Sequence, residues 1–216
     1  MSQHETRAIF VTGTDTDVGK TVVSSWIVHH WNAHYWKPIQ SGLSDPTDSE
    51  TITQLSQIDP QRVFPETYRL NQPLSPHASA AIDGVEIHLE QFQLPTVPHD
   101  ARLVVEGAGG ILVPINDDQM VIDIMQKIGL PILVVARSGL GTLNHTLLTL
   151  AALRNRKLVV AGVVMVGQVN DSNREALEHY GQTTVLAELP RFETLNHQSL
   201  AQFPLPKKLH QYLESI

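Results

Sequence analysis

The sequence contains no cysteine, no long hydrophobic run and few basic residues. The lack of cysteine excludes disulfide bonds, cysteine-ligated zinc, iron–sulfur clusters and thiol nucleophiles. The longest apolar runs, such as residues 130–136 and 158–166, are shorter than the ~18 residues that cross a bilayer. Residues 1–7 are polar and no apolar stretch follows them, so we expect no secretory leader and a cytoplasmic location.

Basic residues are outnumbered by acidic ones, 15 to 22, which gives a net charge of −7. A chain this acidic is a poor general binder of nucleic acid, and we expect neither a nucleic-acid nor a membrane partner. Apolar residues make up 42% of the 216 residues, which argues against a disordered chain. The length fits a single domain, residues 1–216, with a sizeable core.

Short β-branched runs alternate along the chain with stretches of helical periodicity. Strands are predicted at 8–12, 103–106, 131–136, 158–166 and 184–189, and helices at 19–31, 120–127, 143–155, 173–179 and 206–216. Continuous apolar strands that alternate with helices are typical of a parallel sheet covered on both faces. The pattern therefore predicts an α/β fold with a central, mostly parallel sheet flanked by helices.

The segment from about 42 to 100 departs from this pattern. It is rich in proline, glutamine, serine and histidine, with weak helical periodicity only at 51–57 and 87–93. Excursions this long in compact domains are usually functional or disordered. We expect two short helices here, and the sequence leaves open whether the segment orders only on binding.

Residues 13–21, GTDTDVGKT, follow the first predicted strand and open the next predicted helix. In that position the backbone N–H groups of the loop and of the helix start can face a phosphate chain. Lys20 would reach the β- and γ-phosphates, and the Thr21 hydroxyl would ligate Mg²⁺. Five residues rather than four separate Gly13 from Gly19, so an ordinary strand–helix turn is the competing interpretation.

Glu106 ends an apolar strand at 103–105, in the position of a strand-end acid that serves a nucleotide-bound metal. Burying a carboxylate alone is costly, and Mg²⁺ is a natural partner because it takes one or two carboxylates together with phosphates. A helix N-terminus that satisfies Glu106 is the alternative.

Five segments in order carry a resemblance to a known family: GTDTDVGKT at 13–21, WKPIQSG at 36–42, SPH at 75–77, VEGAGG at 105–110 and GLGTLNH at 139–145. Together they resemble the dethiobiotin synthetases, ATP-dependent carboxylase-cyclases of biotin synthesis. The resemblance spans roughly residues 8–190 and implies a three-layer P-loop NTPase fold.

The resemblance also implies the chemistry. CO₂ would add to one amine of 7,8-diaminopelargonic acid, and the carbamate would attack the γ-phosphate of ATP. The second amine would then close the ureido ring of the mixed carbamic–phosphoric anhydride and expel phosphate. ATP is the co-substrate, Mg²⁺ the cofactor and a homodimer the expected assembly.

The family's site residues carry over onto matching positions. Lys37 and Lys20 would be catalytic, because a fixed cation at the carboxyl edge of the sheet can stabilise a carbamate or a transferring phosphoryl group. Thr21, Asp48 and Glu106 would hold the metal. Asp45 competes with Asp48 for the role of second acid, and helix capping is a third interpretation of this acidic stretch.

The expected nucleotide contacts are Asp17, Val18, Gly19, Lys20, Thr21, Val22, Asp48, Glu106, Gly107, Ala108, Gly109, Gly167, Gln168, Pro190, Arg191 and Phe192. The expected substrate contacts are Ser41, Gly141, Thr142, Leu143 and Asn144, the last four through the distal carboxylate at the dimer interface. One departure concerns the base. The family often has an Asn-Asp pair where this chain has residues 166–168, so either Gln168 substitutes for the asparagine or base choice is relaxed.

Other functions account for fewer of these features. A nucleotide-driven switch ATPase or GTPase shares the loop and the strand-end acid, but gives no reason for the segments at 37–38 and 75–77. A non-catalytic nucleotide-binding domain has no use for an intact Lys20, Thr21 and Glu106. A zinc site at His29, His30 and His34 lacks the glutamate of the usual helical motif.

Overall fold

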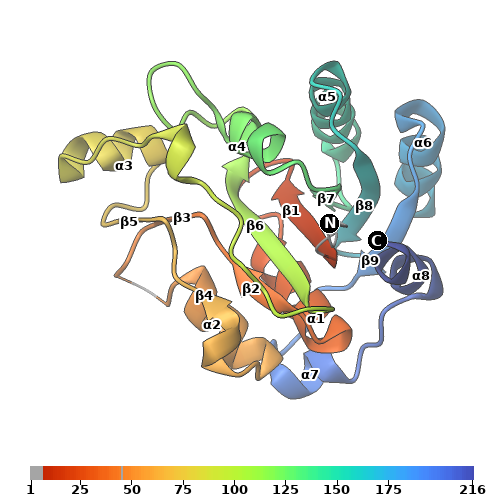
Figure 1. The fold of residues 1–216 in the computed structure, drawn as a ribbon. Helices are drawn as coiled ribbons and strands as arrows, with labels where there is room; N and C mark the ends of the chain where they lie inside the picture. Colours follow the sequence, from red (N-terminus) through yellow and green to blue (C-terminus); the bar gives the residue numbers. More distant parts are fainter. Residues whose placement is uncertain (1–6, 45) are drawn as a thin grey trace.

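A computed structural model describes residues 7–44 and 46–216 (Figure 1). Its centre is a sheet of seven parallel strands in the order β4-β2-β6-β1-β7-β8-β9. The strands are β1 (Arg7–Gly13), β2 (His34–Trp36), β4 (Val63–Phe64), β6 (Arg102–Gly110), β7 (Ile132–Arg137), β8 (Val160–Val166) and β9 (Val185–Leu189). Strands β3 (Ile39–Ser41) and β5 (Tyr68–Leu70) form a small parallel pair beside it.

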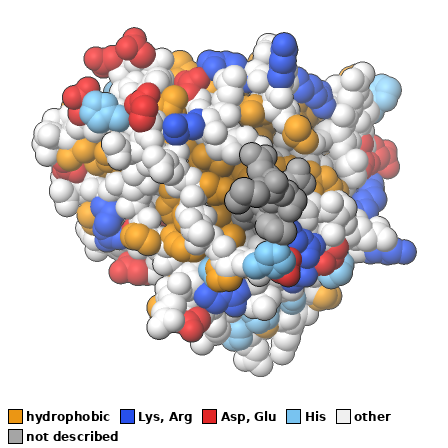
Figure 2. Space-filling model, in the orientation of Figure 1, with side chains coloured by type: hydrophobic (Ala, Val, Ile, Leu, Met, Phe, Trp, Pro, Cys, Tyr) orange, Lys and Arg blue, Asp and Glu red, His pale blue; other side chains and the backbone are white. Residues whose placement is uncertain are grey.

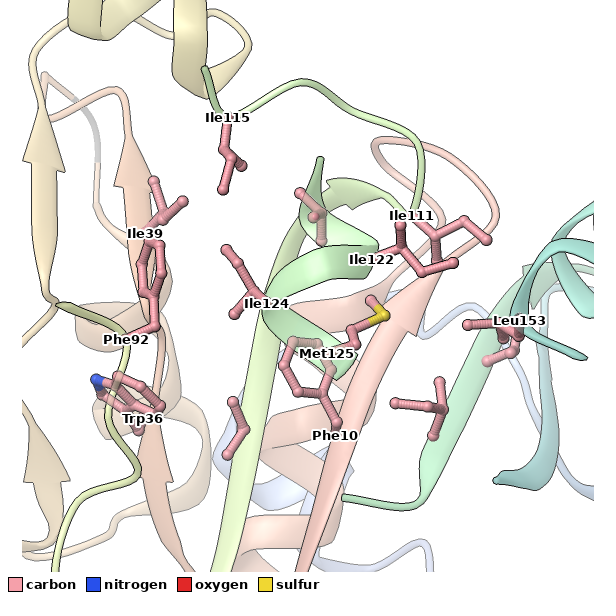
Figure 3. Packing of buried hydrophobic residues seen from close by; sticks show 14 of the residues in the cluster. Phe10, Trp36, Ile39, Phe92, Ile111, Ile115, Ile122, Ile124, Met125 and Leu153 are labelled. Carbon is pink, nitrogen blue, oxygen red and sulfur yellow. The ribbon is translucent and has the colours of Figure 1, made fainter. Parts of the chain in front are cut away.

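Helices cover both faces of the sheet, as the alternating pattern predicted. They are α1 (Lys20–Trp31), α2 (Asp48–Ser56), α3 (Pro76–Asp83), α4 (Val121–Ile128), α5 (Thr142–Asn155), α6 (Asp171–Gly181), α7 (His197–Ala201) and α8 (Lys207–Ser215). One core cluster joins the sheet to α1, α2, α7 and α8. The other joins it to α3–α6, and Figure 3 shows Phe10, Ile124 and Met125 packed within it. The three-layer prediction is therefore confirmed.

Strand β6 shows how the sheet positions a functional side chain. Leu103 and Val105 lie in the cluster under α4, whereas Val104 lies in the cluster under α1. Because side chains alternate between faces, Glu106 projects to the α1 side, as Val104 does. The strand runs on to Gly110, past the end predicted at Glu106, so this carboxylate meets the start of α1 from the middle of β6.

The 42–100 excursion differs in part from expectation. Helix α2 forms slightly earlier than predicted, but the second helix is not at 87–93, where only a short 3-10 turn, Leu89–Gln91, occurs. Ile87 and Phe92 are buried in the core, but the segment that carries them has no α-helix. The helix is α3, because Pro76 stands at its first turn and Gly84 ends it in the left-handed conformation. The short α7, begun by an Asn196 capping box, was also not predicted.

The two ends of the described chain meet on one side of the molecule. The Arg7 guanidinium donates to the carbonyl of Ile216 at 2.9 Å.

On the face shown in Figure 2, acidic and basic side chains are interspersed around an apolar centre. Among the described residues, none of the helices combines the length and apolar character that a bilayer crossing requires.

Candidate active site

A cavity of about 770 Å³ opens at the carboxyl ends of β1, β2 and β6. Eleven of the residues predicted from the sequence line it: Asp17, Gly19, Lys20, Thr21, Val22, Lys37, Ser41, Asp48, Glu106, Ala108 and Gly109. These residues come from four separate stretches of chain. Ligands bind at this edge in open α/β sheets, because loops from several strands converge there.

The phosphate loop joins β1 to α1 along one wall of the cavity. Gly19 takes a left-handed backbone conformation, with φ 99°, and a Cβ there would lie 3.2 Å from the Val166 side chain. The Lys20 ammonium is buried and donates to the backbone carbonyl of Asp15 at 2.9 Å. Burial lowers the pKa of Lys20 despite the attraction of Glu106. A polyanion in this cavity would act in the opposite direction and raise the pKa of Lys20 by attraction.

Three side-chain oxygens converge at the end of the loop. The Thr21 hydroxyl lies 2.5 Å from Oδ1 of Asp48 and 3.1 Å from Oε1 of Glu106. Glu106 is 0% exposed. A hydroxyl and two carboxylates form an all-oxygen set of the kind that Mg²⁺ accepts while keeping waters and phosphate oxygens in its other positions. The residues present therefore fit a magnesium ion.

Lys37 lies between the same two acids. Its ammonium is 2.7 Å from Oδ2 of Asp48 and 3.3 Å from Oε1 of Glu106. Burial alone would lower the pKa of Lys37, but the two carboxylates outweigh it and hold the pKa above its usual value. Likewise, burial acts to raise the pKa of Asp48, but Lys37 brings the net pKa below its usual value. The cluster is thus ionic at neutral pH, and Lys37 points into the cavity rather than into bulk solvent.

In the acidic stretch before α2, helix capping and the cavity use different residues. Thr47 is the N-cap, and it forms a capping box with Glu50. Asp48 is therefore not the cap and has its carboxylate directed at Thr21 and Lys37. Asp45, the competing candidate, lies outside the described residues.

Two buried residues at the site were missed by sequence reasoning. The Gln40 side chain accepts a hydrogen bond from the Asp48 backbone N–H at 3.1 Å and donates to the carbonyls of Ser41 and Gly42. The Tyr35 hydroxyl donates to Oε2 of Glu106 at 3.1 Å, and burial next to this carboxylate raises the pKa of Tyr35 well above its usual value. The only signal in the sequence is the position of both residues beside Lys37.

Several predicted residues lie outside this cavity. Val18 and Gly107 are buried behind its wall. The proposed base contacts, Gly167, Gln168, Pro190, Arg191 and Phe192, follow the ends of β8 and β9 at the same sheet edge but do not line it. Gly141, Thr142, Leu143 and Asn144 form the start of α5 and do not line it either. The structure does not bring these nine residues into the cavity that Thr21, Asp48 and Glu106 line.

A second cavity of about 460 Å³ lies between the phosphate loop and α5. It shares Thr16 and Val113 with the first cavity and is also lined by Leu112, His145 and Leu148. The shared residues make the two hollows neighbours. A ligand longer than a nucleotide's phosphates therefore has room to extend from one toward the other.

Comparisons with known proteins agree with this fold and site. A family model described as an AAA domain matches residues 7–199. A ParA family ATPase from Chlorobium tepidum TLS superposes with a TM-score of 0.54 at 10% identity, over 99% of this chain and 98% of that one. The cell division ATPase MinD from Pyrococcus furiosus gives 0.51 at 14% identity, over 97% and 96%. Such low identities show a shared fold alone, and this fold is the predicted P-loop NTPase fold.

Sequence relatives are much closer. The ATP-dependent dethiobiotin synthetase BioD of Paramagnetospirillum magneticum is 50% identical over 93% of this chain and 96% of its own length. The protein of the same name from Brucella ovis is 45% identical over 94% of this chain and 90% of its own. With such identity across nearly the whole sequence, the chain belongs to the ATP-dependent dethiobiotin synthetase family.

Proposed function

We propose that this chain carboxylates 7,8-diaminopelargonic acid and closes its ureido ring at the expense of ATP, with the residues around Lys37 as the reaction centre. Family membership makes the chain an ATP-dependent ligase of biotin biosynthesis. In balanced form, one amine bonds to CO₂ and releases a proton to give a carbamate. The carbamate oxygen takes the γ-phosphoryl group and ADP leaves. The second amine then attacks the carbamoyl carbon, and phosphate departs with loss of a proton.

The observation that carries this proposal is the position of Lys37. It is buried, charged and held by two carboxylates in a cavity that the phosphate loop also lines. A switch ATPase needs the loop, but the reaction above needs in addition a cation beside the group that accepts the phosphoryl. We assign Lys37 to the carbamate and transferring phosphoryl oxygens, and Lys20 to the β- and γ-phosphates.

We assign a magnesium ion to Thr21, Asp48 and Glu106, on the strength of their converging oxygens. Bound there, Mg²⁺ would neutralise charge on the phosphate oxygens of ATP. The protein's own part is to orient the nucleotide and diamine, since correct placement of reacting groups can replace covalent assistance from the enzyme. Ala108 and Gly109 line the cavity and support the nucleotide contact that we assign to residues 107–109, whereas Gly107 itself is buried.

The diamine would lie against the apolar part of the cavity wall. Ile39, Leu74 and Val113 line it and suit an alkyl chain. Ser41 supports a polar contact, because its buried hydroxyl has no hydrogen-bond partner among the described residues. Buried polar groups are usually satisfied, so a ligand amine or carbamate is a suitable partner for Ser41.

The start of α5 fits the proposal through a second copy of the chain. Leu140 is fully exposed, and Leu112 and Leu148 are 58% and 62% exposed. Leu112 and Leu148 line the same hollow, and exposed apolar side chains that lie together favour association. In the proposed homodimer, residues 141–144 of one copy would face the other copy's cavity and hold the distal carboxylate at a helix N-terminus.

The base contacts are assigned to the loops after β8 and β9, namely Gly167, Gln168, Pro190, Arg191 and Phe192. Val166, at the end of β8, adjoins Gly19 of the phosphate loop, and the next residue, Gly167, adjoins Ser138. The position of Val166 supports this placement. The reaction needs only small-molecule partners, so we propose a cytoplasmic enzyme that requires neither nucleic acid nor membrane.

The test is mass spectrometry of the product from diaminopelargonate, ¹³C-bicarbonate and ATP, repeated with CTP and GTP. A labelled ureido product formed in a one-to-one ratio with ADP supports the proposal. Rapid nucleotide hydrolysis that needs neither diamine nor bicarbonate would contradict it and favour a switch. Light scattering of the same preparation tests the homodimer, which a monomeric mass would exclude.

A further inference from the structure

Tyr35 approaches the site from inside the protein. It is 0% exposed, and its hydroxyl donates to the equally buried Glu106 at 3.1 Å. The parallel pairing of β2 with β6 sets this contact, because Tyr35 lies opposite Val104. Tyr35, Val104 and Glu106 project to the face that carries α1, where Thr21 lies in the first turn of the helix. The sheet register therefore places a phenol beneath the Glu106 carboxylate.

The two oxygens of Glu106 have separate partners. Oε1 faces the Thr21 hydroxyl at 3.1 Å and the Lys37 ammonium at 3.3 Å. Oε2 accepts the hydrogen bond from Tyr35. One oxygen thus faces the converging side chains of the cavity while the other is anchored within the core. A hydrogen bond on Oε2 fixes the carboxylate plane and leaves Oε1 free to face the cavity.

We infer that Tyr35 is a positioning residue for metal binding: its hydroxyl holds Glu106 so that Oε1 stays directed toward Thr21 and Asp48. This inference rests on the proposed function, in which Glu106 is a magnesium ligand. A neutral donor suits the task, because it orients the carboxylate without adding a positive charge that would oppose the metal. Removing an outer hydrogen-bond partner of a metal ligand typically weakens metal affinity by about 10–100-fold.

The competing explanation is that Tyr35 only fills the core. Its ring belongs to the cluster under α1, and a phenylalanine would fill the same volume. The hydroxyl separates the two explanations, since its buried hydrogen-bond partner is Glu106. A change that removes only this oxygen therefore tests positioning and leaves the packing in place.

The experiment is calorimetric titration of the full chain and its Tyr35→Phe variant with ADP, in EDTA and at increasing Mg²⁺ concentrations. We expect the Mg²⁺ concentration that half-maximally strengthens ADP binding to rise about 10–100-fold in the variant. ADP affinity in EDTA should be unchanged. The matched control is Tyr68→Phe, whose hydroxyl accepts from the His88 N–H away from the cavity. An unchanged Mg²⁺ requirement in Tyr35→Phe overturns the inference, as does an equal loss of ADP affinity in EDTA.

A second measurement does not depend on how well Tyr35→Phe folds. The chain has four tyrosines, so replacing Tyr68, Tyr180 and Tyr212 by phenylalanine leaves Tyr35 as the only site for 3-fluorotyrosine. Its fluorine resonance should shift when Mg²⁺ is added to the ADP-bound protein, and an unmoved resonance would overturn the inference. If ADP binding to the unmodified chain is itself independent of Mg²⁺, the proposed metal site fails instead, so the two failures are distinguishable.

Discussion

The ammonium nitrogen of Lys37 lies 2.7 Å from Oδ2 of Asp48, on the wall of the cavity that also contains the phosphate loop. Glu106 flanks the same nitrogen from the middle of β6. The two acids keep the pKa of Lys37 above its usual value although burial opposes this. A cation that is buried and yet charged can stabilise negative charge where water is scarce.

Replacing Lys37 should therefore abolish most of the chemistry. We expect Lys37→Ala, and Lys37→Met with a side chain of similar length, to lower the rate of dethiobiotin formation by ~10² or more. The measurement is the steady-state rate of product formation at saturating ATP and diamine. The reason is the loss of charge stabilisation on the carbamate and the transferring phosphoryl group.

The control for this pair is Lys127→Ala, on the exposed side of α4. It removes a lysine remote from the cavity and should leave turnover unchanged. Thermal unfolding of each variant checks that the loss of the cation beside Glu106 has not unfolded the chain. Near-normal turnover in a folded Lys37→Met protein would remove Lys37 from the reaction.

Two substitutions at Thr21 distinguish the role of its hydroxyl from the role of its shape. Thr21→Val loses the oxygen that lies near Asp48 and Glu106, whereas Thr21→Ser keeps it. We expect the valine variant to need at least about tenfold more Mg²⁺ for half-maximal turnover, in line with losses seen around metal sites. The serine variant should behave like the unmodified chain. Equal Mg²⁺ requirements in the two variants would argue that Thr21 is not a ligand.

The sequence is most informative where local order fixes position. Residues at the ends of parallel strands meet at one sheet edge, so the order of motifs along the chain is enough to predict that Thr21, Lys37 and Glu106 come together. Gln40 and Tyr35 cannot be assigned in this way. Tyr35 acts through a hydrogen bond to the distant Glu106 and Gln40 through one to the Asp48 backbone, and a glutamine or tyrosine in a short strand has no distinctive spacing.

The excursion is less predictable because its helices are set by end signals rather than by periodicity. The apolar spacing at 87–93 suggests a helix, but Ile87 and Phe92 are buried on a segment that forms no α-helix. Pro76 and Gly84 delimit the true helix α3. Residues 141–144 do not line the cavity, and the role that we propose for them requires a second copy, which one chain cannot supply.

Gly19 is expected to tolerate no side chain. Its φ of 99° is unfavourable for other residues, and a Cβ would press on Val166. Gly19→Ala should lower the free energy of unfolding by about 1–3 kcal/mol and weaken ATP binding, because the loop backbone must shift. Urea unfolding and ATP titration measure the two effects.

Gly129→Ala is the matched control for Gly19. Gly129 also has a positive φ, 73°, but nothing lies within 4 Å of an added Cβ. Gly129→Ala should lower the free energy of unfolding by part of the amount expected for Gly19→Ala. It should leave ATP binding unchanged. If Gly19→Ala bound ATP as tightly as Gly129→Ala, the loop geometry would not matter for the nucleotide.

The C-terminal helix offers a test of pH dependence away from the cavity. Glu214 on α8 lies 3.2 Å from Arg7 and 3.0 Å from Arg102, at the starts of β1 and β6. Burial acts to raise the pKa of Glu214, but the two arginines outweigh it and hold the pKa below its usual value. A lowered pKa in the folded state means that the stabilisation is present above the unfolded-state pKa and is lost as the pH falls through the folded one.

Glu214→Gln should accordingly lower the free energy of unfolding at pH 7 by at most about 1 kcal/mol, since the group is partly exposed. The difference from the unmodified chain should persist down to about pH 5 and close below about pH 4, near the unfolded-state pKa of glutamate. Urea unfolding at several pH values measures it. Glu175→Gln, at an exposed position on α6, is the control. A gap for Glu214→Gln that widened on acidification would have the wrong sign for a carboxylate stabilised by arginine, and would assign the effect to packing instead.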